Sequence, residues 1–81
     1  MMNLDENSYK TSDLTLAATL SLHFPIVLID KSSSRKVFFV FYRSPELDQY
    51  IERFWRSEIT IEPQVFANQV KSLKTRIYSE E

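Results

Sequence analysis

Residues 36–42, Lys-Val-Phe-Phe-Val-Phe-Tyr, constrain the fold of this chain more than any other stretch. A run of β-branched and aromatic residues, bounded by polar residues on both sides, predicts a single β-strand. Side chains alternate between the two faces of a sheet, so this strand should be apolar on both. The two sets are Val37, Phe39 and Phe41 on one face, and Phe38, Val40 and Tyr42 on the other. Both faces are therefore expected to need cover.

Composition limits the possible classes of protein. With 81 residues, 43% of them hydrophobic, the chain should form one globular domain with a small core. Its formal net charge of −1 produces no overall attraction for nucleic acid or anionic lipid. The sequence has no cysteine and no glycine, which excludes disulfides, thiolate metal sites and glycine-rich phosphate loops. We find no secretory signal and no membrane span, and expect a cytoplasmic protein that does not associate with membranes.

The first half of the chain predicts a helix followed by a β-hairpin. Residues 1–10 are polar and without periodicity, and are expected to form a flexible N-terminal segment before a single globular domain at 11–79. Thr11-Ser12-Asp13 predicts a helix start, with a hydroxyl N-cap followed by an acid in the first turn. Phe24-Pro25 should end this helix. Residues 26–30 then predict a strand that pairs with 36–42, with Asp30 opposite Lys36.

The second half predicts two more helices and a short strand. Ser44-Pro45-Glu46 is typical of a helix start, and the spacing of Tyr50 and Trp55 places both in the core. Residues 58–62 alternate between charged or polar and apolar side chains and predict an edge strand. Pro63 should open a helix that ends near Tyr78, with a core ridge of Phe66, Val70, Leu73 and Ile77. The predicted class is α+β in the order α-β-β-α-β-α, a central antiparallel hairpin plus a short third strand, with the strand order left open.

The second face of the hairpin is the predicted interaction surface. The pairing of Asp30 with Lys36 gathers apolar side chains there, and a patch of that size exceeds what monomers usually expose. Its members are Ile26, Leu28, Phe38, Val40 and Tyr42. Either helices cover this face or another chain does. The second alternative makes the protein a non-enzymatic interaction or structural module, with a protein partner or a second copy of itself.

Several of these positions together resemble a known family. They are Thr11-x-Asp13-Leu14-x-Leu16-Ala17-Ala18-x-Leu20, Phe24-Pro25, Val37-x-Phe39-x-Phe41, Leu47, Tyr50, Pro63, Phe66 and Lys74. This pattern, spread over residues 11–78, is similar to that of a small bacterial and phage-borne family classed as a domain of unknown function. The resemblance implies no activity, cofactor or catalytic residue. The family often has glycine where this chain has His23, which argues against a left-handed helix cap at that position.

Catalytic and metal-binding groups are few. His23 is the only histidine, and no nucleophile or carboxylate accompanies it at a recognisable spacing. A histidine at a helix end is more typical of an interaction with the helix dipole. The carboxylates of Glu46 and Asp48 diverge on one helix, and no calcium-loop spacing is present. We therefore predict no enzyme, no catalytic residue, no cofactor and no metal.

Nucleic-acid binding is the alternative function. Basic residues lie in acid-free stretches near the hairpin and in the last helix, close to tyrosines that could stack on bases. The candidate contacts are Arg35, Lys36, Lys71 and Lys74.

Overall fold

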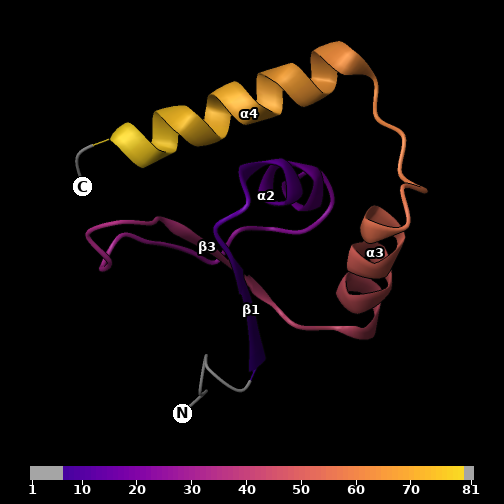
Figure 1. Ribbon diagram of the computed structural model, residues 1–81, viewed down its shortest axis with the longest axis horizontal. Helices are drawn as coiled ribbons and strands as arrows, with labels where there is room; N and C mark the ends of the chain where they lie inside the picture. The colour runs from indigo at the N-terminus through magenta and orange to yellow at the C-terminus, as the bar shows by residue number, and fades with distance from the viewer. Residues whose placement is uncertain (1–6, 80–81) are drawn as a thin grey trace.

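A computed structural model of the protein describes residues 7–79. Within this part of the chain, three helices and a three-stranded antiparallel sheet confirm the α+β class (Figure 1). The elements in chain order are β1 (Ser8–Thr11), α2 (Leu14–Ser21), β2 (Leu28–Asp30), β3 (Phe38–Tyr42), α3 (Pro45–Trp55) and α4 (Pro63–Tyr78). The strand order is β1-β3-β2, so the aromatic strand β3 is the central one.

The third strand does not come from the predicted part of the chain. Residues 58–62 form no strand, whereas residues 8–10, expected to lack structure, belong to β1. Residues 1–6 of the expected flexible segment lie outside the described residues. Ile59 and Ile61 instead line a hollow beside Phe54 and Phe66, and residues 58–62 pair with no strand of the described sheet. An alternating pattern is therefore compatible with a strand but does not supply the neighbour that a strand needs.

The hairpin register also differs from the prediction. Asp30 pairs with Phe38 and not with Lys36. The loop explains the difference: the Asp30 carboxylate accepts hydrogen bonds from the Ser32 N–H and O–H, and the Ser33 hydroxyl accepts from the N–H groups of Arg35 and Lys36. These local bonds hold residues 32–36 in a wide turn outside the ladder. Because the offset is two residues, each β3 side chain keeps its predicted face.

Helix α2 lies at the centre of the core. Its five consecutive residues 16–20 are all buried, and the helix contacts β1, α3 and α4. A helix that is buried on every side needs small residues, and Ala17 and Ala18 allow the neighbouring elements to approach closely. Asp13 is the N-cap, with its carboxylate accepting the Leu16 N–H at 3.1 Å, so the predicted hydroxyl cap is wrong. Thr11 accepts the Asp13 N–H and supports that cap.

Helix α3 begins as predicted, with Ser44 as N-cap and Pro45 at the first position. Leu47 is fully buried, and Tyr50 is half-buried against the rings of His23 and Phe24. Trp55, by contrast, is 61% exposed, so its predicted place in the core is wrong. It is the last residue of α3.

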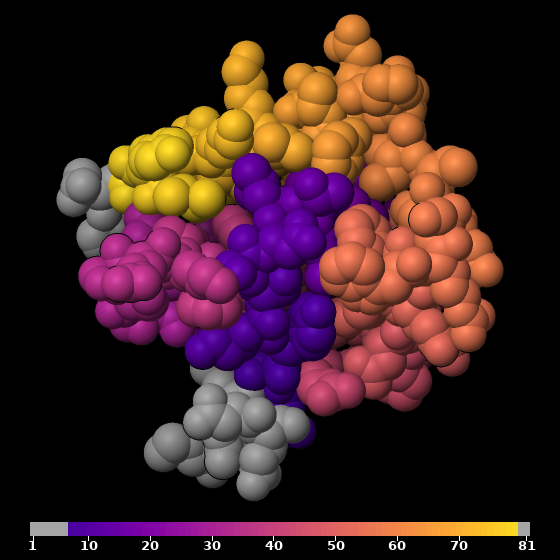
Figure 2. All heavy atoms as spheres, in the orientation of Figure 1, coloured from indigo at the N-terminus to yellow at the C-terminus, as the bar shows by residue number. Residues whose placement is uncertain are grey.

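Helix α4 runs from Pro63 to Tyr78, as predicted, and packs along α2 (Figure 2). The Glu62 carboxylate caps its first turn by accepting the Val65 N–H. Leu73 is buried, and Phe66, Val70 and Ile77 are half-buried against the core, which confirms the predicted ridge. A 2.7 Å hydrogen bond from the Gln69 amide to the Ser21 hydroxyl ties the middle of α4 to the end of α2.

Candidate interaction surface

The two faces of the sheet have different surroundings. Phe39 and Phe41 point into the cluster formed with the three helices, and their β1 partners Thr11 and Tyr9 share that side. The opposite side of the sheet, which we call the open face, is defined by the register. Its members are Ser8, Lys10, Leu28, Asp30, Phe38, Val40 and Tyr42. Among residues 7–79, the helix residues of the core cluster all pack on the side of Phe39 and Phe41.

The predicted interface residues are only partly brought together there. Leu28 and Tyr42 are 47% and 48% exposed, and Phe38 is half-buried. Val40 lies between its cross-strand partners Lys10 and Leu28 and is only 3% exposed, so it offers little surface to a partner.

Ile26 is not on the open face, which corrects the prediction. Strand β2 begins only at Leu28, and Ile26 precedes it in irregular structure. The alternation of faces therefore does not extend back to Ile26, which packs against the main core instead.

One base and one acid lie on the open face. The Lys10 ammonium is 3.5 Å from the Asp30 carboxylate and 5.2 Å from the centre of the Phe38 ring. The aliphatic part of a lysine can cover apolar surface while its charge stays in water. The open face thus has a charged pair beside Phe38 and an apolar region around Leu28 and Tyr42.

Among residues 7–79, three side chains have displaced pKa values. The hydroxyl and N–H of Ser32 donate to Asp30 and, with Lys10, hold the pKa of that carboxyl below its ordinary value. Burial raises the pKa of Tyr9, and the nearby Asp13 carboxylate adds to this. Burial also raises the pKa of Tyr50, against the opposing effect of Arg53.

The shift at Asp30 predicts acid sensitivity. A carboxyl whose folded-state pKa is lowered contributes stability above its unfolded pKa, here 3.8, and loses that contribution as the pH falls through the folded-state value. The melting temperature should therefore fall more steeply below about pH 4 in the native protein than in Asp30→Asn, whose side chain can still accept from Ser32. Thermal unfolding followed by circular dichroism at several acidic pH values measures this. Parallel curves for the two proteins would contradict it.

The four predicted nucleic-acid residues are all exposed, and no side-chain hydrogen bond or ion pair engages them within residues 7–79. Lys71 and Lys74 lie one turn apart on α4. Arg35 and Lys36 belong to the loop after β2, and the Lys31 ammonium of that loop donates to the Ser79 carbonyl at 3.1 Å. This contact brings the loop to the end of α4. Other basic side chains are already paired, including Arg43 with Asp48 and Arg56 with Glu52.

A hollow beside Trp55 was not predicted. Its volume is about 470 Å³, and its lining includes Phe54, Trp55, Ile59, Ile61 and Phe66. The Trp55 and Phe54 rings meet edge to face, with centroids 4.9 Å apart. The sequence signal that could have indicated this hollow is the position of Trp55 at the end of a helix, directly before a segment without regular secondary structure.

The described residues thus define a small α+β domain whose sheet carries helices on one side. The chain belongs to the family described as Domain of unknown function (DUF5659), whose model matches residues 6–79. The curated proteins and the solved structures contained no match to this chain. Within residues 7–79, no helix is both long enough and apolar enough to cross a membrane.

Proposed function

We propose that this domain is a non-enzymatic interaction module that associates with a second copy of itself through the open face. The observation that carries the proposal is the exposure of Leu28 and Tyr42 beside the half-buried Phe38, on the side of the sheet opposite the core cluster. Removing such side chains from water stabilises an interface by about 25 cal/mol for each Å² of apolar surface.

Charge favours a second copy as the occupant. The open face carries one lysine and one aspartate, so its net charge is zero. In a dimer of identical copies, the lysine of each copy has the aspartate of the other as a possible partner. When two such faces meet about a two-fold axis, Lys10 of one copy can approach Asp30 of the other. The whole chain has a formal net charge of only −1, so the electrostatic repulsion between two copies is small.

The size of the sheet limits the strength of this association. Three strands of at most five residues span roughly 14 by 16 Å, from ordinary strand spacing and rise. An interface of this kind is at the small end of those known, where association is transient. We therefore expect a dissociation constant in the micromolar range or weaker.

The test is sedimentation equilibrium over a dilution series. From about 1 mM to about 1 μM, the average mass should fall from that of a dimer toward the monomer mass of 9.6 kDa. A monomer at every concentration would overturn the proposal.

A second candidate is nucleic-acid binding through Arg35, Lys36, Lys71 and Lys74. The observation that favours it is the Lys31–Ser79 hydrogen bond, which joins the loop that holds Arg35 and Lys36 to the C-terminal end of α4. If the domain binds in this way, Lys71→Ala and Lys74→Ala should each weaken binding and reduce its salt dependence by about one counterion per charge. Gel mobility with single-stranded and duplex DNA and with RNA at low salt measures this. Unchanged mobility with all three would remove this candidate.

A further inference from the structure

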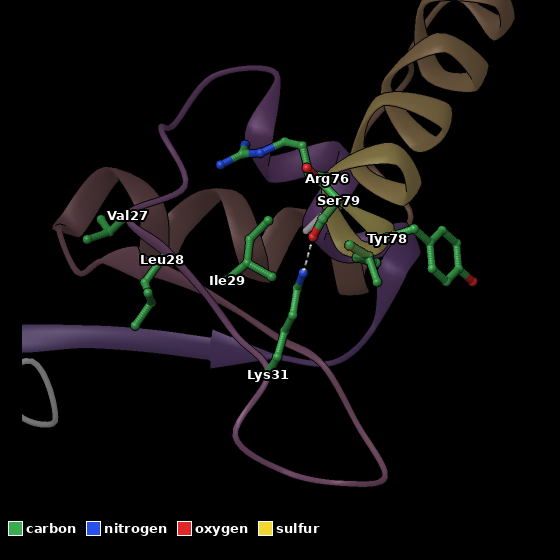
Figure 3. A pocket seen from close by; sticks show the side chains of 8 residues that line it. Val27, Leu28, Ile29, Lys31, Arg76, Tyr78 and Ser79 are labelled. Atoms are coloured by element: carbon green, nitrogen blue, oxygen red, sulfur yellow. Dashed lines mark hydrogen bonds between the residues drawn. The ribbon is translucent and has the colours of Figure 1, made fainter. Parts of the chain in front are cut away.

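A groove separates the outer edge of β2 from the last turn of α4 (Figure 3). Its volume is about 840 Å³. Residues 27–29 and Lys31 line one side, and residues 76–79 line the other. The groove therefore combines the edge of a sheet with the exposed end of a helix.

Within residues 7–79, no further strand pairs with the outer edge of β2, which borders the groove. Val27 donates its N–H to the Val40 carbonyl at 2.8 Å, so Val40 turns its polar backbone groups toward β2. Backbone groups alternate in direction along an antiparallel strand, so the next residue, Phe39, turns away from β2. Ile29 lies opposite Phe39, and by the same alternation its N–H and C=O point outward at the free edge. An edge of this kind can accept another extended strand.

The side chains of the groove are basic and apolar. Among the described residues that line the groove, Lys31 and Arg76 are charged, and none is acidic. The Arg76 guanidinium has no hydrogen bond or ion pair within the described residues, and in Figure 3 its side chain extends away from Lys31, on the side of Val27. Ile77 and Tyr78 add apolar surface, with Tyr78 79% exposed.

We propose that this groove binds an extended, acidic peptide segment of a partner protein as an added strand beside β2. The Ile29 N–H and C=O supply main-chain hydrogen bonds. Arg76 and Lys31 attract carboxylates of the segment, and Ile77 and Tyr78 contact an apolar side chain between them. The groove lies at the edge of the sheet, so this proposal does not depend on self-association through the open face.

The test uses two synthetic peptides and isotope-labelled full-length protein. The acidic probe is acetyl-Glu-Val-Thr-Val-Glu-amide, and the control has lysine in place of both glutamates. In amide NMR spectra, the acidic peptide should shift Ile29, Lys31 and residues 76–79 most, and the basic peptide should shift none of them. N-methylation of the central threonine, which removes a main-chain donor, should weaken binding.

Charge reversal separates a specific contact from general attraction. Arg76→Glu should weaken binding of the acidic peptide by at least about tenfold and produce binding of the basic one. Lys71→Glu makes the same change on the same helix outside the groove and should alter binding much less. The proposal would be overturned if the two variants lost the same affinity for the acidic peptide, or if the largest NMR shifts lay away from the groove. It would also be overturned if a thymidine oligonucleotide displaced the peptide from the groove.

Discussion

Replacing Phe41 with alanine should lower the free energy of unfolding by about 3–5 kcal/mol. Phe41 is fully buried at the centre of the core, between β3 and the helices, and alanine would leave a cavity that these elements cannot easily close. A domain of 81 residues has only about 5–10 kcal/mol of total stability, so the loss is a large fraction of it. Urea unfolding followed by tryptophan fluorescence and circular dichroism measures the change.

Phe38 is the matched control, because it has the same side chain on the same strand but faces the other side of the sheet. It is half-buried beneath Lys10. Phe38→Ala should therefore lower the free energy of unfolding by about 1 kcal/mol, which is part of the free energy of transferring a phenylalanine side chain out of water. Equal costs for the two variants would show that the assignment of the two faces is wrong.

Tyr42→Glu should convert the proposed dimer into a monomer. Tyr42 is 48% exposed at the end of the central strand, and two-fold apposition of the open faces would bury a carboxylate there without a partner. We expect the dimerisation constant to weaken by at least about thirtyfold, the factor that corresponds to about 2 kcal/mol. The dilution series in the analytical ultracentrifuge measures it, and melting of the monomer tests that the fold is intact.

Tyr78→Glu is its control, since it introduces the same charge at an even more exposed tyrosine outside the sheet. This variant should dimerise as the native protein does. If Tyr78→Glu weakens the dimer and Tyr42→Glu does not, the interface lies at the end of α4. If only Trp55→Ala weakens it, the interface lies at the hollow beside α3.

Local chemistry made much of the fold predictable. Pro45 and Pro63 start helices because their fixed φ suits the first helical turn, and both helices begin there. The apolar run around Phe39 could only be a strand with two apolar faces, and those faces are preserved in the structure despite the change of register.

The third strand could not be predicted because its signal is weak. Residues 8–11 contain one large apolar side chain, Tyr9, and form a strand only because the free edge of β3 lies beside them. The segment 58–62 has a clearer alternation but pairs with no strand of the described sheet. A β-strand needs a partner strand that is distant in sequence. Residue propensity and hydrophobic periodicity therefore predict strands less well than they predict helices.

The candidate surface was predictable in the same limited way. Leu28, Phe38 and Tyr42 were assigned to the correct face, because alternation is a property of the strand itself. Whether helices cover that face was not predictable. The structure gathers α3 and α4 around α2, on the side of Phe39 and Phe41.

The amino-acid sequence by itself determined where α3 and α4 begin, which residues of β3 share a face and which side of α4 is apolar. These properties follow from backbone and side-chain geometry within a few consecutive residues. Only the tertiary structure decided that β1 completes the sheet, that α2 is buried on every side and that Trp55 is exposed. Each of these depends on which distant segment lies alongside, and that is set by the packing of the whole chain.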